Sequence, residues 1–342
     1  MKHIAISALI GASLLAGVPA HAQAPLYHLV DTVPLGGLVK FDYLKIDPAR
    51  HWLYISHGSE ETVLTLANLK IRGELSGLDG SHGIAVDPVG GLIWADSAQK
   101  GLAIAFDPRS FKPVAQVKVI DDADGMAYDA ASKTIFVSGG DGKGLTPIDP
   151  ATRKAGADIA LGAAPESFVV DGHGALYVNL IDKNEIDRID TATRKITATW
   201  PTTGCDEPTG LALDQAKRWL FASGRGGSLD VLNADTGAVI ATLPIGKGTD
   251  SAAFDATRQR AFSSNGDGTL TVVDDRGSVP KVMATITTKP GARTLAVDPV
   301  TGNVYTVTGK VASVTPASGP DGHPHYSFVP GSLELLVYAP TR

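Results

Sequence analysis

Residues 209–223 read TGLALDQAKRWLFAS, and this stretch decides the fold. Apolar and small residues lead up to Asp214, a short polar turn follows, and a second apolar run begins at Trp219. Apolar runs of this length on both sides of a turn predict two antiparallel β-strands. Two further apolar segments follow downstream, and we expect a unit of four strands, over Thr209–Leu213, Trp219–Ser223, Leu229–Leu232 and Val239–Leu243.

The same unit recurs along the chain. A strand that ends in aspartate, a turn and a second apolar strand appear seven times, with marker aspartates 40 to 43 residues apart, at Asp47, Asp87, Asp129, Asp171, Asp214, Asp255 and Asp298. Seven four-stranded units of this period predict an all-β, seven-bladed β-propeller of antiparallel blades. Glycine, proline and β-branched residues in every unit argue against helical repeats. Aspartate at the start of a turn accepts backbone N–H groups, so we assign the marker aspartates a structural role.

The last unit lacks its outer strand. Its three predicted strands cover Thr294–Val297, Val304–Val307 and Leu333–Tyr338. The N-terminal stretch Leu26–Leu35 has the missing pattern, and we expect it to complete this blade, because closure removes exposed sheet edges. The prediction is therefore one domain over residues 23–342. It includes a long loop at 309–331, rich in proline, glycine and serine, that we expect at the channel mouth.

Residues 1–22 combine a basic start, an apolar run and the exit Ala20-His21-Ala22, which is typical of a cleaved signal peptide. We therefore expect a periplasmic or secreted protein with no transmembrane segment in the mature chain. The 30 Lys and Arg against 36 Asp and Glu, a net charge of −6, do not favour general nucleic-acid binding. Cys205, the one cysteine, can form no intramolecular disulfide. We expect a monomer.

Polar residues share one position in the repeat. Five residues before each marker, where the innermost strand begins, the chain has Asp42, His82, Asp124, Glu166, Thr209, Asp250 and Arg293. Glu207 lies just before Thr209, and the loops after the second strands add residues at the same end of the channel. The predicted ligand-binding residues at this mouth are Asp42, His57, His82, Asp124, Glu166, Asn184, Glu207, Asp250, Asn265 and Arg293.

Three interpretations of this ring stay open. Carboxylates with histidine can hold a divalent metal ion, for which the candidates are His57, His82, Asp124, Glu166 and Asp250. The same groups can exchange protons as acid and base, or they can simply be hydrated. Our first hypothesis is a periplasmic protein that binds a small molecule, a peptide or a partner protein. The alternative is a metal-dependent hydrolase or lyase. No Gly-x-Ser-x-Gly or phosphate-binding loop is present.

The repeat resembles the YVTN-type β-propeller family, with its YncE-like exported bacterial proteins. The segments that carry the resemblance include Phe41-Asp-Tyr43, Ser56-His-Gly58, Asp182-Lys-Asn-Glu-Ile186, Glu207-Pro-Thr-Gly-Leu-Ala212 and Gly291-Ala-Arg-Thr294. The resemblance covers essentially the whole mature chain. It implies a seven-bladed fold, export and a binding role, and it implies no particular reaction.

Overall fold

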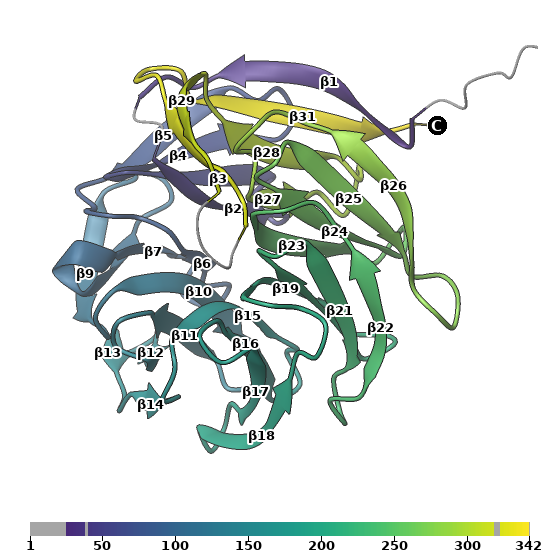
Figure 1. Ribbon diagram of the computed structural model, residues 1–342. Helices are drawn as coiled ribbons and strands as arrows, with labels where there is room; N and C mark the ends of the chain where they lie inside the picture. Colours follow the sequence, from purple (N-terminus) through teal and green to yellow (C-terminus); the bar gives the residue numbers. More distant parts are fainter. Residues whose placement is uncertain (1–24, 38–39, 318–321, 342) are drawn as a thin grey trace, which may run out of the picture.

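The computed structural model describes residues 25–37, 40–317 and 322–341. These residues form seven antiparallel sheets around a central axis, together with one two-stranded hairpin (Figure 1). The predicted seven-bladed β-propeller is confirmed. The predicted signal peptide, residues 1–22, lies outside the described residues.

The first three blades follow the order of the chain, each from its inner strand outward. Blade one has β2 (Phe41–Asp47), β3 (Trp52–His57), β4 (Glu60–Thr65) and β5 (Ile71–Ser76). Blade two has β6 (Ile84–Val86), β7 (Ile93–Ser97), β8 (Leu102–Phe106) and β9 (Pro113–Lys118), with a short 3-10 helix at Ala98–Lys100. Blade three has β10 (Ala123–Asp129), β11 (Thr134–Gly139), β12 (Gly144–Asp149) and a divided outer strand, β13 (Lys154–Ala155) and β14 (Ile159–Ala160).

The next three blades repeat this order without a break. Blade four has β15 (Pro165–Val170), β16 (Ala175–Leu180), β17 (Glu185–Asp190) and β18 (Lys195–Pro201). Blade five has β19 (Pro208–Asp214), β20 (Trp219–Gly224), β21 (Ser228–Asn233) and β22 (Val239–Pro244). Blade six has β23 (Thr249–Asp255), β24 (Arg260–Asn265), β25 (Thr269–Asp274) and β26 (Lys281–Thr287).

Blade seven joins the two ends of the described chain. Its strands, from the inside outward, are β27 (Leu295–Val297), β28 (Val304–Thr308), β31 (Glu334–Pro340) and β1 (Tyr27–Pro34). The N-terminal strand β1 pairs antiparallel with β31, as the sequence predicts. Tyr27 is fully buried, and its ring packs edge-on against Phe262 of blade six at 5.4 Å. The closing strand is thus held by side-chain packing as well as by its backbone.

The insertion in blade seven has regular structure. Where the sequence predicts a long loop at 309–331, the chain forms a hairpin of β29 (Val311–Thr315) and β30 (His325–Phe328). The segment is rich in proline, glycine and serine, which predicts a loop. Its two strands contain only five and four residues, too few to change that prediction. The hairpin forms a separate two-stranded sheet and belongs to none of the blades.

The marker aspartates form the turns assigned to them. Each is almost completely buried. Each carboxylate accepts a backbone N–H two or three residues further on, as in the contacts of Asp47 with Ala49 and of Asp298 with Val300, both at 3.0 Å. The other five do the same. A buried carboxylate that is bonded to backbone amides fixes the turn and is not available for other chemistry.

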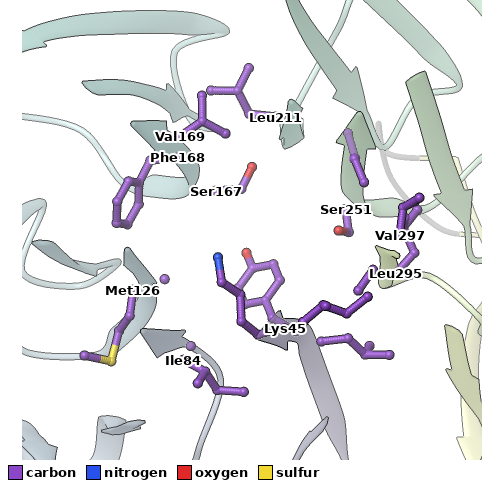
Figure 2. Close-up of a pocket in the computed structure, with 18 of the residues that line it drawn as sticks. Lys45, Ile84, Met126, Ser167, Phe168, Val169, Leu211, Ser251, Leu295 and Val297 are labelled. Atoms are coloured by element: carbon purple, nitrogen blue, oxygen red, sulfur yellow. The ribbon is translucent and has the colours of Figure 1, made fainter. Parts of the chain in front are cut away.

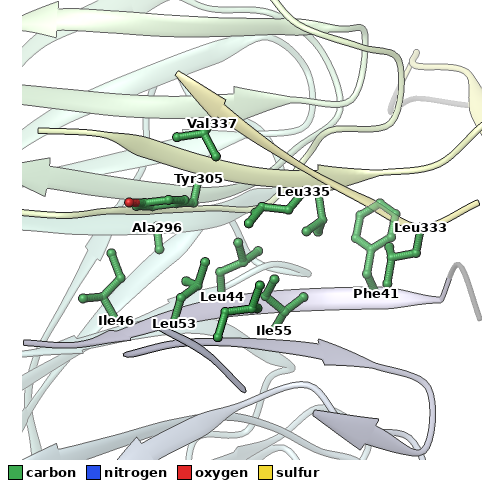
Figure 3. Packing of buried hydrophobic residues seen from close by; sticks show 12 residues of the cluster. Phe41, Leu44, Ile46, Leu53, Ile55, Ala296, Tyr305, Leu333, Leu335 and Val337 are labelled. Atoms are coloured by element: carbon green, nitrogen blue, oxygen red, sulfur yellow. The ribbon is translucent and has the colours of Figure 1, made fainter. Parts of the chain in front are cut away.

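Apolar side chains fill the space between neighbouring blades. At the seam between blades seven and one, Leu53 and Ile55 pack against Leu335 and Val337 (Figure 3). Burial of a side chain of this kind contributes about 1.5–3 kcal/mol. Similar clusters lie at the other seams, so packing between blades holds the ring together.

The seven inner strands form a closed ring around the axis. Each of them contacts the next, and the last contact joins β27 to β2 (Figure 1). Residues that are far apart in the sequence therefore meet at the channel. No helix among the described residues is long and apolar enough to cross a membrane.

Candidate functional site

A cavity of about 420 Å³ lies at the channel mouth, where the inner strands begin. Six of the predicted residues line it, and they come from six different blades: Asp42, His82, Asp124, Glu166, Asp250 and Arg293. The phase of the repeat thus brings together side chains that lie up to 251 positions apart, the distance from 42 to 293. Tyr43 lies beneath them, because it lines both this cavity and the channel below.

One side of the cavity is an ion-pair network. Arg293 donates from Nε to Oδ2 of Asp250 at 2.6 Å, and Arg225 donates from Nη2 to Oδ1 of Asp250 at 3.2 Å. Arg225 also lies 3.4 Å from Oε1 of Glu166. Burial alone would raise the pKa of Asp250, but the two guanidinium groups outweigh it and lower that pKa. Asp250 is therefore ionised at neutral pH.

Glu166 differs from Asp250 although it shares Arg225. Burial and the nearby charge of Asp250 raise the pKa of Glu166 to about 8. Arg225 opposes this shift but does not cancel it. Glu166 is therefore mainly protonated at pH 7, and its carboxyl group can donate as well as accept a hydrogen bond.

Asp42 and Asp124 face the cavity on the other side. Among the described residues, neither carboxyl group has a hydrogen-bond or ion-pair partner. Burial and the charge of Asp250 raise the pKa of Asp42 to about 6. Burial and the charge of Asp42 raise the pKa of Asp124 well above its usual value. Two carboxyl groups with raised pKa values and free oxygens are suited to receive N–H or O–H donors from a ligand.

His82 carries a positive charge next to this pair. Its Nδ1 lies 3.3 Å from Oδ2 of Asp96 and 3.1 Å from the carbonyl oxygen of Ala123, both of which are acceptors. Oδ1 of Asp96 accepts the backbone N–H groups of His82 and Gly83. Burial would lower the pKa of His82, but the hydrogen bond and charge of Asp96 raise it to about 10. Nδ1–H therefore donates to these acceptors, and the imidazole is protonated at neutral pH.

His57 lies apart from the cavity lining. Its Nε2 is 2.7 Å from the hydroxyl of Thr62, and its Nδ1 is 3.9 Å from Oε1 of Glu60. Burial lowers its pKa. His57 ends β3, the second strand of its blade, so its side chain starts further from the axis than that of His82. Four of the five predicted metal ligands thus line the cavity and His57 does not. The described residues contain no group of three or more His, Cys, Asp or Glu side chains placed to hold a metal ion.

The other predicted residues hold loops and turns. Asn265 is fully buried and donates to the hydroxyls of Thr269 and Thr271 within blade six. Asn184 accepts the backbone N–H of Glu207 at 2.8 Å. Glu207 is not part of the cavity lining, but its charge acts on Arg225, which is.

The hairpin lies beside the mouth. The ring of Phe328 in β30 is 5.8 Å from Phe41, and Phe41 also supports the guanidinium of Arg293 at 5.5 Å. Near the tip, Lys247 donates to the carbonyl oxygen of Gly322 at 3.3 Å. The hairpin therefore spans from blade seven to the connection between β22 and β23, in front of the ring of blades in Figure 1.

The described lining of the mouth and channel includes residues outside the predicted set, among them Tyr43, Lys45 and Arg225. Arg225 stands eleven residues after its marker, where five other units have Gly58, Ala98, Gly140, Gly266 and Gly309 and the remaining unit has Asp182. A long charged side chain, where most units have glycine or alanine, was the sequence signal that Arg225 reaches the cavity. The sequence places Arg225 in a loop at this end of the channel, but its segment Ser223-Gly-Arg-Gly-Gly227 was interpreted as a tight turn and Arg225 was given no binding role.

Comparison with known proteins supports the fold. No protein-family model matches the chain, and no curated protein sequence matches it. Among solved structures, hydrazine synthase from Kuenenia stuttgartiensis superposes with a TM-score of 0.69 at 15% sequence identity. The match covers 84% of this chain and 96% of that one. At this identity the likeness shows a common fold, and it gives no information on the activity of this protein.

Proposed function

We propose that this protein is a binding protein that recognises a small molecule or peptide through a cationic group, at the mouth of the propeller channel. The observation that carries the proposal is the pair Asp42 and Asp124, whose carboxyl groups face the cavity without a partner. Both residues are partly exposed to the cavity, so a cationic ligand that supplies N–H donors can replace water there with charge-assisted hydrogen bonds.

The charges of the cavity favour an amine or a guanidinium over an anion. Among the described residues, seven carboxyl groups line it, against Lys143, Arg225, Arg293 and His82. Both arginines pair with Asp250, and Arg225 also approaches Glu166. A cation placed against Asp42 and Asp124 would offset the negative charge around them: the charge of Asp42 contributes to the raised pKa of Asp124, and the charge of Asp250 to that of Asp42. His82 limits the positive charge that the cavity accepts, so a ligand with one cationic group fits better than a polycation.

We further propose that the protein acts outside the cytoplasm and belongs with the YVTN-type propellers. The apolar N-terminal segment and the repeat support these two proposals. The absence of a recognised catalytic motif in the sequence favours binding over catalysis.

The test is a thermal-shift screen with organic monocations, including butylguanidine, tyramine, propylamine and choline, followed by calorimetry of any compound that stabilises the protein. We expect at least one amine or guanidinium compound to raise the melting temperature. The double variant Asp42→Asn, Asp124→Asn should weaken its binding at least about tenfold. Glu74→Gln, which removes a carboxylate from an exposed position on β5, is the matched control and should bind as the wild type does.

The metal-dependent alternative is tested in the same screen. Ca²⁺, Mg²⁺, Mn²⁺, Zn²⁺ and Fe²⁺ should leave the melting temperature unchanged if the cavity is a site for organic cations. Stabilisation by one of these ions that disappears in the double variant would favour the metal site. A screen in which no cation of either kind stabilises the wild type would overturn the proposal.

A further inference from the structure

A second cavity of about 360 Å³ occupies the channel below Tyr43 (Figure 2). Its walls are the inner strands of the blades and are largely apolar, with Ile84, Met126, Phe168 and Leu295 among the lining residues. Pro48 and Pro299, from turns that follow β2 and β27, line it at the end away from the mouth. Its volume lies within the range of about 300–1,000 Å³ typical of small-molecule sites.

In the described lining of this lower cavity, blade one alone contributes large polar side chains. Two residues before the marker, it has Lys45, where the other units have Ala85, Ala127, Val169, Ala212, Ala253 and Ala296. Four residues before the marker, it has Tyr43, where the others have Gly83, Gly125, Ser167, Gly210, Ser251 and Thr294. The small residues of six blades leave the space that these two side chains enter. The ring of blades is nearly symmetric, but the channel is not.

Lys45 points into the middle of this cavity (Figure 2). It is the one charged side chain in the described lining, and its amine has no hydrogen-bond or ion-pair partner among the described residues. Solvent reaches the side chain through the cavity, while the surrounding protein lowers the pKa of the ammonium by desolvation. Asp47 is close by, but its carboxylate is occupied by Arg50, at 2.7 Å, and by backbone N–H groups.

Water in the channel can solvate this ammonium, but among the described residues no acidic side chain in the apolar lining pairs with it. A ligand that supplies an anionic group would pair it, and an apolar body on that ligand would bury the walls of the cavity. An anion at the mouth would meet Asp42 and Asp124 instead. The two cavities therefore suit ligands of opposite charge, with Tyr43 between them.

We propose that the channel cavity is a second binding site, separate from the mouth, for a small amphipathic carboxylate. The carboxylate pairs with Nζ of Lys45, and the apolar body lies against Ile84, Met126 and Phe168, extending toward Pro48 and Pro299.

Calorimetry with octanoate, and with 1-octanol as its uncharged analogue, tests this site. We expect octanoate to bind the wild type at least about tenfold more tightly than octanol does. Lys45→Met should reduce octanoate affinity to that of octanol, and Lys45→Arg should retain it. Lys70→Met, at an exposed position before β5, is the matched control and should bind octanoate as the wild type does. The double variant at Asp42 and Asp124 should also bind octanoate normally, which separates this site from the mouth.

A second readout needs no variant. The lysines can be labelled with ¹³C-methyl groups by reductive methylation, and their NMR signals followed with pH. Binding of octanoate should raise the pKa of the Lys45 amine. At pH values between the pKa of the free protein and that of the complex, binding is then accompanied by proton uptake. Equal affinity for octanoate and octanol, an unchanged Lys45 signal on saturation with octanoate, or wild-type affinity in Lys45→Met would each overturn the proposal.

Discussion

Arg293, in the loop before β27, donates a hydrogen bond of 2.6 Å from Nε to Oδ2 of Asp250 in β23. Arg225 approaches the other oxygen of the same carboxylate. One ionised aspartate thus neutralises much of the charge of two arginines from blades five and seven. This arrangement explains why Asp250 stays ionised while Asp42 and Glu166 have raised pKa values.

Replacement of Asp250 by asparagine should destabilise the protein. Arg225 and Arg293 would each lose a charged acceptor while remaining in the cavity wall, and we expect a loss of about 1–3 kcal/mol in the free energy of unfolding. Urea denaturation measures it. Glu74→Gln, which touches none of these groups, should change the free energy by less than about 0.5 kcal/mol. Equal stability of the Asp250→Asn variant and the wild type would show that the network contributes nothing.

Glu166 should make the protein less stable as pH rises. Its pKa is about 8 in the folded protein and about 4.3 in an unfolded chain. Between these values the folded state binds more protons than the unfolded state, so the free energy of unfolding falls with increasing pH. Calorimetric melting at several pH values from about 4.5 to 8.5 should show a smaller decline in Glu166→Gln than in the wild type. Parallel curves for the two proteins would refute this role.

His82 should remain protonated across the physiological range. NMR titration of its imidazole in the wild type should show no transition near the usual value of about 6.5, because Asp96 raises its pKa to about 10. Asp96→Asn removes that charge and should bring the transition down into the range below pH 8 or so. A transition near pH 6.5 in the wild type would mean that the contact between His82 and Asp96 is not an ion pair.

Tyr27 should be needed to close the ring. Its side chain is fully buried at the seam of blades six and seven and is bonded to Arg260 at 3.2 Å. Tyr27→Ala should cost about 3–5 kcal/mol, the range for loss of a large buried aromatic side chain. Val30→Ala on the same strand, where the side chain is half exposed, is the control and should cost less than about 1 kcal/mol. A small effect of Tyr27→Ala would mean that backbone pairing of β1 suffices for closure.

Most of the fold could be predicted from the sequence because each blade repeats the same local signals. Asp214 and its six counterparts mark one turn in every unit, so the number of blades follows from counting them. The strands predicted for blade five agree with β19 to β22 to within about two residues, the usual uncertainty of strand ends. The hairpin was not predicted, since its strands are short and its composition is that of a loop.

The site could be predicted only in part. The position five residues before each marker predicts how far along the channel axis a side chain lies, and six of the seven residues at this position line the cavity. It does not give the distance of a side chain from the axis, which is why His57 and Asn265, at the ends of second strands, turn to partners within their own blades. Tyr43 and Lys45 stand out when the units are aligned, but only the structure shows that both enter the channel.

The most direct test of the proposed function is a crystal structure of the wild-type protein soaked with tyramine, compared with the Asp42→Asn, Asp124→Asn variant under the same conditions. Our account predicts density for the ligand on the axis in the wild type, with a nitrogen within hydrogen-bond distance of the carboxylates of Asp42 and Asp124, and no such density in the variant. A mouth cavity that holds only water in both crystals, or tyramine bound equally in both, would contradict it.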